Sequence, residues 1–268
     1  MPLLKIEGLS VEHGPGSKSP AVKDVSFTLN EGMTIGIIGE SGAGKSTMAL
    51  AIAGLLERSA NVDGQVIYDG RNLLMLSEKE MCGIRGSGIS MIFQDPRSSL
   101  DPSMRVVDQV AEPLRFHLGV KPKEARVQAR RLLADVKVTD DVFAVAPRAH
   151  QLSGGLCQRV MIAAALACNP KVLIADEPTS SLDLTLQAQI IELLQERQKA
   201  SGLGLIFITH DLALVSKIAD RIMVMNEGAI VEEGGVDAVI GNPASSYTAG
   251  LVSVWTGSVR KGKEIASS

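Results

Sequence analysis

Aromatic residues are scarce in this 268-residue chain, at 3% of the sequence. The core must therefore be built from Val, Ile, Leu, Ala and Met, which argues against an aromatic-rich β-sandwich and against a stacking surface for single-stranded nucleic acid. An excess of positive charge is missing too, since 27 Lys and Arg stand against 30 Asp and Glu, for a formal charge of −3. Nucleic acid is therefore not a partner that the composition indicates.

Cysteines are few and widely spaced. Cys82, Cys157 and Cys168 form no CxxC pair and no metal-ligand spacing, so we interpret them as reduced, as in a cytosolic protein. Long apolar runs are absent: the longest, 160–168, is half of the roughly 18 residues that span a bilayer. The first residues lack the basic-then-apolar pattern of a secretion signal. We expect a chain that is not secreted and does not cross a membrane by itself.

What the sequence does contain is an alternation of short apolar runs with helical patterns. Near-continuous apolar runs are typical of strands buried on both faces of a parallel sheet, and they occur at 34–38, 89–93, 171–175, 205–209 and 221–225. Helical patterns occupy 45–56, 123–136, 158–167, 184–200 and 212–219. The alternation predicts an α/β fold with a mostly parallel core sheet and right-handed crossovers.

Three regions depart from this pattern. The stretches 3–30 and 62–70 look like half-solvated antiparallel strands, which predicts an N-terminal antiparallel β-subdomain. Residues 95–165 are rich in helical pattern and interrupt the strands, so we predict a helical subdomain inserted into the sheet. From residue 236 to 268 we expect a peripheral tail, with the last ten residues poorly ordered.

The strongest chemical signal is GESGAGKST at residues 39–47, which follows an apolar strand, opens a helical pattern and matches G-x-x-x-x-G-K-[ST]. Its glycines let successive N–H groups face phosphate oxygens at a helix N-terminus. Lys45 would then neutralise the β- and γ-phosphates, and the Ser46 hydroxyl would bind Mg²⁺. The alternative is a glycine-rich turn that binds nothing, which the filled motif disfavours. The predicted nucleotide-binding residues are Gly39, Glu40, Ser41, Gly42, Ala43, Gly44, Lys45, Ser46 and Thr47.

Two adjacent acids, Asp176 and Glu177, end the apolar run at 171–175. A carboxylate at the carboxyl end of a strand can reach the metal held by Ser46, so we predict that Asp176 is a metal ligand. Strand alternation aims Glu177 elsewhere, where it can polarise an attacking water as a general base. Adjacent acids are often only a solvated strand end, but the phosphate loop favours the chemical interpretation.

Two further polar residues follow apolar runs directly. Gln94 follows the run at 89–93, and His210 follows the run at 205–209. Each alone is more typical of a turn at a strand end than of catalysis. In an open parallel sheet, however, ligands bind outside the carboxyl ends of the strands. We therefore expect Gly39, Gln94, Asp176 and His210 to converge on one edge.

A fifth element, Leu152-Ser153-Gly154-Gly155, precedes the helical pattern that begins near residue 158. Small residues before a helix can make a second anion-binding N-terminus. Taken in isolation, Ser153 is equally explained as an ordinary helix N-cap.

In this order, these segments resemble the motifs of the ATP-binding cassette (ABC) ATPases. Residues 39–47 resemble the Walker A loop, Gln94 the Q-loop, 152–155 the signature motif, 176–177 the Walker B motif, 181–183 the D-loop and His210 the switch histidine. The resemblance covers residues 3 to about 235, so we expect a nucleotide-binding domain at 1–235 that takes ATP and Mg²⁺.

The family resemblance also implies roles. Two cassettes pair head to tail, so Ser153, Gly154 and Gly155 would bind the nucleotide held by the partner's Walker A loop. Gln94 would sense the γ-phosphate or metal, which adds it to Ser46 and Asp176 among the predicted metal ligands. The residues that the resemblance implies for catalysis are Lys45, Gln94, Glu177 and His210. ATP binding would close the dimer and hydrolysis would reopen it.

A finer resemblance is to the branch that imports peptides, nickel or metal chelates. It is carried by FQDPRSSLDP at 93–102, by SGGLCQRVMIA at 153–163 and by a partial tail motif with Asn242-Pro243, Tyr247-Thr248 and Leu251. The branch implies a second, paralogous ATPase in a heterodimer, two transmembrane permeases and an extracytoplasmic binding protein. It also implies a peripheral position on the cytoplasmic face of the inner membrane. No Cys follows Cys168, so we predict no iron–sulfur cluster.

Two residues depart from the family pattern. Leu156 stands where the common signature has Gln, so the site built from this motif would turn over differently. His13 stands where the family stacks an aromatic residue on adenine. Imidazole stacks more weakly and with a pH-dependent charge. A surface loop residue is an equal interpretation of His13.

Other functions remain as alternatives. A non-transport ABC ATPase that acts on DNA or ribosomes usually carries long coiled coils or two cassettes, and this sequence shows neither; its acidic balance also disfavours nucleic acid. A P-loop GTPase or small-molecule kinase is a further class, but the Asn-Lys-x-Asp motif that reads guanine is missing. Exporter cassettes are usually fused to their membrane spans.

Overall fold

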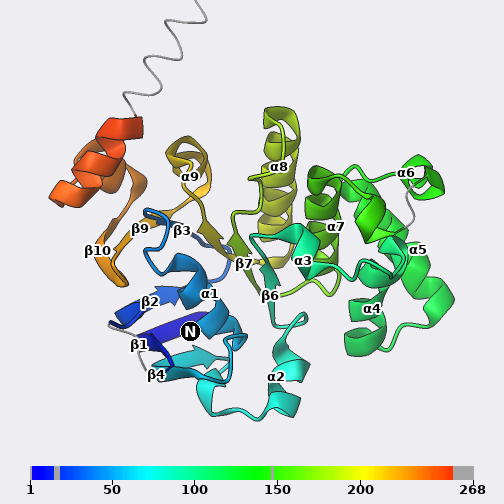
Figure 1. Cartoon of the computed structure of the whole chain (residues 1–268), viewed down its shortest axis with the longest axis horizontal. Coiled ribbons are helices and arrows are strands. Elements are labelled where there is room, and N and C mark those ends of the chain that lie inside the picture. The colour runs from blue at the N-terminus through cyan, green and yellow to red at the C-terminus, as the bar shows by residue number, and fades with distance from the viewer. Residues whose placement is uncertain (1, 15–18, 146–147, 256–268) are drawn as a thin grey trace, which may run out of the picture.

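The chain forms two sheets with helices packed around them (Figure 1), in a computed structural model that describes residues 2–14, 19–145 and 148–255. The smaller sheet is antiparallel, in the order β2-β1-β4-β5. Its strands are β1 Leu4–His13, β2 Val22–Leu29, β4 Ala60–Tyr68 and β5 Arg71–Asn72. The alternating pattern in the first 30 residues and at 62–70 is thus confirmed as antiparallel structure.

The larger sheet has the order β10-β9-β3-β8-β7-β6. Its strands are β3 Thr34–Ile38, β6 Ile89–Ile92, β7 Val172–Asp176, β8 Gly204–Ile208, β9 Arg221–Asn226 and β10 Ala229–Gly234. All neighbours are parallel except β10, which pairs antiparallel with β9. Every position of β3, β6, β7 and β8 is buried, which explains their unbroken apolar sequences. The prediction of a mostly parallel core sheet is confirmed.

The helices flank and extend this sheet. They are α1 Lys45–Ala53, α2 Glu78–Ile84, α3 Pro96–Ser99, α4 Val106–Leu118, α5 Pro122–Asp135, α6 Asp140–Val145, α7 Gly154–Leu166, α8 Leu184–Ser201 and α9 Leu212–Ile218. Short helical turns occupy Leu73–Met75, Ala149–Gln151 and Asp237–Gly241. Five helical patterns in the sequence match α1, α5, α7, α8 and α9. Among the described residues, no helix is both long and apolar enough to span a bilayer.

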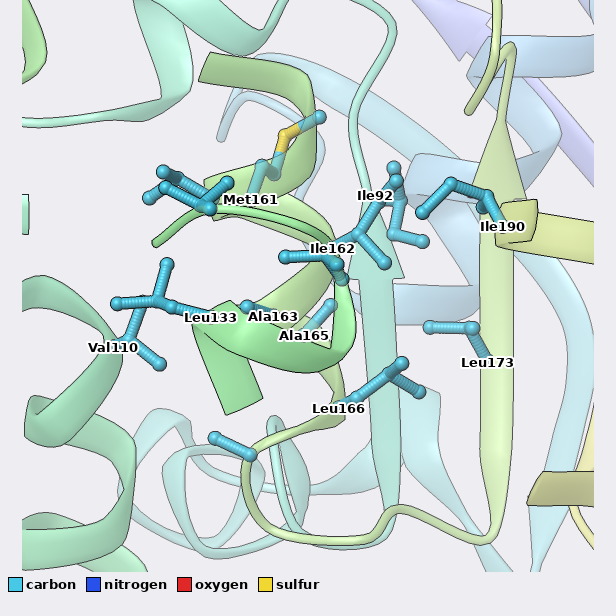
Figure 2. Close-up of a cluster of buried hydrophobic side chains, with 14 of the residues drawn as sticks. Ile92, Val110, Leu133, Met161, Ile162, Ala163, Ala165, Leu166, Leu173 and Ile190 are labelled. Carbon is cyan, nitrogen blue, oxygen red and sulfur yellow. The ribbon is translucent and has the colours of Figure 1, made fainter. Parts of the chain in front are cut away.

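Helices α3 to α7 lie between β6 and β7 in the chain, although these strands are neighbours in the sheet. The apolar core continues from the sheet into this helical segment through α7. Figure 2 shows α7 between Val110 and Leu133 of α4 and α5 on one side and Ile92 and Leu173 of β6 and β7 on the other. Burying each such side chain contributes about 1.5–3 kcal/mol.

The C-terminal segment packs at the other end of the sheet, beside β9 and α9. Residues 246–255 are helical, and Tyr247, Leu251 and Trp255 pack against a core cluster that includes Val215 of α9 and Val224 of β9. Residues 236–255 therefore contribute to a core, which goes beyond the peripheral tail that the composition suggested. The last ten residues, for which we expected poor order, lie outside the described residues.

Candidate active site

The strands β3, β8, β7 and β6 are neighbours, so the residues that follow them meet at one edge of the sheet. A cavity of about 540 Å³ opens there, within the size range of small-molecule sites. Its lining is polar and glycine-rich: His13, Ala21, Gly39, Ser41, Gly42, Gly44, Lys45, Ser46, Thr47, Gln94, Asp176, Glu177 and His210. The structure thus brings together the segments that the sequence placed separately at four strand ends.

The 39–47 loop joins β3 to α1 and requires glycine at two positions. A Cβ on Gly39 would lie 2.2 Å from the carbonyl oxygen of Met225, and one on Gly44 would lie 2.2 Å from that of Ala21. Gly44 has φ +99° and precedes the first residue of α1. This helix has no acidic residue in its first turn and no side-chain cap among the described residues, so its N-terminus is open to an anion.

Lys45 is folded back onto this loop. Its Nζ donates hydrogen bonds to the carbonyl oxygens of Gly39, at 2.8 Å, and Glu40, at 2.7 Å. The side chain is 9% exposed. Burial lowers the pKa of Lys45 from its ordinary value, and the nearby negative charges of Glu177 and Asp176 oppose that effect. The ammonium group is thus held in a site that already carries compensating acids.

Asp176, the last residue of β7, is 2% exposed. Burial raises the pKa of its carboxyl, while a hydrogen bond with Ser46 and the charge of Lys45 act in the opposite direction. Within the described part of the chain, its Oδ1 finds no hydrogen-bond partner. A buried orphan oxygen next to a hydroxyl fits a Mg²⁺ ion, which binds through one or two protein oxygens and completes its shell with phosphate and water.

Glu177 and His210 form a pair at the same edge. Oε1 of Glu177 lies 2.7 Å from Nδ1 of His210. The Glu177 side chain is 12% exposed and that of His210 is 75% exposed. Glu177 has φ +51°, a left-handed conformation that costs a non-glycine residue about 1–3 kcal/mol. Its N–H donates to the carbonyl of Ile208 in β8, which helps to hold the residue in that conformation.

The remaining predicted residues divide into two groups. Gln94 and His13 line the cavity, the latter at the end of β1, while Glu40 and Ala43 belong to the loop but do not line the cavity as far as the described residues show. Ala21, which sequence reasoning missed, also lines the cavity. An alanine before a strand carries no chemical signal, so only the fold could reveal it.

The 153–155 segment begins α7 away from this cavity, whose described lining does not include it. Ser153 is the N-cap of α7, and its Oγ accepts a hydrogen bond from the N–H of Leu156 at 3.3 Å. A Cβ on Gly155 would lie 3.0 Å from the carbonyl oxygen of Ser181, so the segment packs closely on the 181–183 loop. Leu156 packs against the core. Ser153 is thus a cap, as one interpretation of the sequence held.

Comparison with known proteins gives a consistent picture. A family model described as ABC transporter matches residues 22–180. The oligopeptide transport ATP-binding protein OppD of Haemophilus influenzae is 44% identical over 252 residues, covering 94% of this chain and 78% of that protein. The dipeptide transport ATP-binding protein DppD of Lactococcus lactis is 44% identical over 253 residues, covering 93% and 72%.

The glutathione import ATP-binding protein GsiA of Salmonella paratyphi A is 45% identical over 258 residues. The match covers 93% of this chain but 41% of GsiA, so the chain spans less than half of that relative's length. Among solved structures, the dimeric ATP-binding cassette MJ0796 bound to ADP and Pi superposes with a TM-score of 0.79 at 30% identity, covering 87% of this chain and 98% of that one.

Proposed function

This chain belongs to the ABC transporter family, and from that premise we propose that it hydrolyses ATP to drive a peptide importer. The observation that carries the proposal is the cavity that unites Lys45, Asp176 and the Glu177–His210 pair beside a glycine loop. The relatives named for oligopeptide transport, dipeptide transport and glutathione import support the substrate class. Nickel or a metal chelate remains an alternative cargo within the proposal, because the sequence resembles the branch of the family that imports peptides, nickel or metal chelates.

Nucleotide binding falls to the loop at 39–47. Backbone N–H groups at the start of α1 point toward the phosphates, and the open helix end favours their charge. Lys45 leaves the carbonyl oxygens of Gly39 and Glu40 and turns to the β- and γ-phosphates. His13, which lines the cavity, would stack on the base. When the nucleotide binds, Lys45 therefore exchanges two backbone carbonyl partners for phosphate oxygens, whose negative charge makes the hydrogen bonds stronger.

Ser46, Asp176 and Gln94 would hold Mg²⁺, which when bound neutralises phosphate charge and orients the oxygens. Glu177 accepts a proton from the attacking water, and His210 orients its carboxylate through the 2.7 Å contact. The strained backbone of Glu177 fixes the direction of this carboxylate. The contact between Glu177 and His210 therefore depends on the register of the neighbouring strands β7 and β8, which these residues follow.

The 153–155 segment is assigned to the nucleotide of a partner cassette. Two observations support head-to-tail pairing: the segment is not part of the cavity lining among the described residues, and the similar cassette is dimeric. We further assign a paralogous ATPase as the partner, two permeases, an extracytoplasmic binding protein and a peripheral position on the cytoplasmic face of the inner membrane. The division into a domain at 1–235, with a helical part at about 95–165, and an extension at 236–268 belongs to the same proposal. No iron–sulfur cluster and no nucleic acid enter it.

The comparisons do not favour the alternative of a non-transport ABC ATPase acting on DNA or ribosomes, because the relatives are named for transport or import. The direct test separates the two. The tagged chain is purified from gently solubilised membranes of its host, and co-purifying chains are identified by mass spectrometry. Two permeases and a second ATPase are expected. Ribosomal or DNA-associated chains without any membrane protein would contradict the importer assignment.

ATP hydrolysis is tested separately by phosphate release from the chain co-purified with its partner cassette, with ATP and Mg²⁺. Glu177→Gln is expected to abolish most of the activity, because it removes the general base. Glu196→Gln, the same change on the exposed face of α8, is the matched control and is expected to leave the rate unchanged. Equal rates for wild type and Glu177→Gln would contradict the assigned reaction.

A further inference from the structure

The C-terminal segment reaches the loop at 39–47. The hydroxyl of Tyr247, on the helical segment 246–255, accepts a hydrogen bond of 3.1 Å from the backbone N–H of Glu40. The two residues are 207 positions apart in the chain. None of the residues assigned to nucleotide chemistry lies in this segment, so the contact joins a region without a role to the loop that holds the phosphates.

The peptide group that Tyr247 contacts is held from both sides. The N–H of Glu40 and the carbonyl of Gly39 belong to one peptide unit, and that carbonyl accepts a hydrogen bond of 2.8 Å from Nζ of Lys45. A donor and an acceptor on the same peptide polarise each other, which strengthens both bonds. The orientation of this peptide unit therefore depends on the tail on one side and on Lys45 on the other.

The loop begins with an unusual backbone at this peptide unit. Gly39 has φ +153°, a value that glycine adopts at little cost. Glycine also gives the chain freedom to leave that conformation, and a contact from outside the loop helps to keep it. The loop turns directly against the carbonyl of Met225 in β9, and Ile222 and Val224 of the same strand belong to the apolar cluster on which Tyr247 packs.

Tyr247 is itself anchored by packing. Its ring joins Leu251 and Trp255 against a cluster that includes Val215 of α9 and Val239. The chain enters this helix through Ala244 and Ser245, whose N–H groups donate to the carboxylate of Glu232 at 2.8 and 3.0 Å. The hydroxyl is therefore presented to Glu40 by a docked element with its own core and its own polar anchor.

The tail also touches the other side of the reaction centre. Val215 lies on α9, which begins at Leu212, two residues after His210. One docked segment thus contacts the phosphate loop through a hydrogen bond and the helix after His210 through apolar packing. Displacement of this segment would remove a support from both.

The geometry points to Tyr247 as a positioning residue for nucleotide binding: its hydroxyl orients the Gly39–Glu40 peptide so that the loop is pre-formed for the phosphates. The inference rests on the proposed function, because it assumes that ATP binds this loop. Coupling between two equilibria is reciprocal, so ATP must also stabilise the docked tail by the same factor by which the docked tail favours ATP.

The first test compares Tyr247→Phe with the wild type. Phe keeps the ring in the apolar cluster and removes only the oxygen that accepts from Glu40. Loss of one neutral hydrogen bond is expected to weaken the binding of a fluorescent N-methylanthraniloyl-ATP by about three- to tenfold. KM for ATP should rise by the same factor with kcat nearly unchanged, as expected for lost pre-organisation of binding. Tyr68→Phe is the matched control, because Tyr68 is the other tyrosine of the chain and lies in β4.

The second test uses Trp255, the single tryptophan of the chain, which lies at the end of the described part of the tail. Quenching of its fluorescence by acrylamide should decrease when unlabelled ATP and Mg²⁺ are added to the wild type and to Tyr68→Phe. In Tyr247→Phe the decrease should be smaller. Protection of Trp255 that depends on nucleotide is a signature that a purely structural role of Tyr247 would not produce.

The outcomes separate the inference from the assigned function. Wild-type chain that binds no ATP would contradict the function itself. ATP binding that is equal in the wild type, Tyr247→Phe and Tyr68→Phe would overturn only the role of Tyr247. A fall in kcat of Tyr247→Phe with unchanged KM would also overturn the role of Tyr247. So would quenching of Trp255 that does not change when ATP is added to the wild type.

Discussion

Oε1 of Glu177 lies 2.7 Å from Nδ1 of His210, although 33 positions separate them in the chain. The distance is set by the sheet: Glu177 follows β7 and His210 follows β8, and these strands are parallel neighbours with Asp176 opposite Ile208. A half-buried carboxylate is thereby joined to an exposed ring. The pair forms a bridge between the interior of the cavity and its open rim.

This pair predicts a non-additive mutant cycle. Glu177→Gln is expected to lower kcat by about 10²–10⁴-fold, because it removes the general base. His210→Ala is expected to act on the same step, by releasing the orientation of Glu177. Residues that act as a unit are not additive, so the double variant should be little worse than Glu177→Gln alone. Phosphate release at saturating ATP measures all four rates, and losses that multiply would show that the two residues act independently.

The 153–155 segment gives a second prediction. Ser153→Arg adds a bulky charge at the start of α7, away from the chain's own cavity lining. Binding of N-methylanthraniloyl-ATP should therefore stay within about twofold of the wild type, while hydrolysis should be lost because the partner's site is blocked. Fluorescence titration and phosphate release measure the two quantities. Ser153→Ala, which removes only the cap of α7, controls for local destabilisation. Full hydrolysis by Ser153→Arg would argue against a shared site.

Much of the fold was accessible from the sequence. Strands buried on both faces leave unbroken apolar runs, so β3, β6, β7, β8 and β9 were each predicted to within a residue or two. Their order in the sheet was not accessible, because it depends on which edges meet after the chain has crossed over. Helix α2 was also missed, since its short sequence of 7 residues carries no clear period.

The candidate site was predicted to the extent that its residues follow strands. Gly39, Gln94, Asp176 and His210 share that placement, and the structure brings them to one cavity. Ala21 and Tyr247 could not be derived in this way. Ala21 carries no reactive group, and Tyr247 reaches Glu40 only because the tail packs beside β9 and α9. Such contacts follow from tertiary packing, which local sequence patterns do not encode.

The contact between β3 and α9 predicts the effect of a substitution on the free energy of unfolding. A second substitution, expected to have the opposite effect, serves as the control. A Cβ on Gly36 of β3 would lie 2.1 Å from Cγ2 of Val215, so Gly36→Ala overpacks the core. We expect it to lower the free energy of unfolding by about 1–3 kcal/mol. Gly83→Ala, in α2, meets no atom within 4 Å of the added Cβ among the described residues. It should raise the free energy of unfolding by about 0.5–1 kcal/mol, because alanine favours helix. Urea unfolding measures both, and equal effects would refute the packing argument.

The anchor of the tail is expected to respond to pH. Although burial of Glu232 acts in the opposite direction, hydrogen bonds from the Thr248 side chain and from the N–H groups of Ala244 and Ser245 hold the pKa of its carboxyl below the ordinary 4.5. A carboxylate with a lowered pKa stabilises the docked tail fully above about pH 4.5 and loses this effect as the pH falls through the lower, docked-state value. Acrylamide quenching of Trp255 should therefore increase on acidification below about pH 4.5 in the wild type.

Glu232→Gln keeps a side-chain oxygen but carries no charge. It should show a more weakly docked tail at pH 7, seen as stronger quenching of Trp255, and no further change of quenching between pH 6 and pH 4, because the titrating group is gone. Circular dichroism over the same range controls for unfolding of the whole chain. If the wild type and Glu232→Gln show the same pH profile, then groups other than Glu232 govern docking of the tail. In that case the route from the tail to the phosphate loop would depend on the apolar contacts of Tyr247, Leu251 and Trp255 with the sheet.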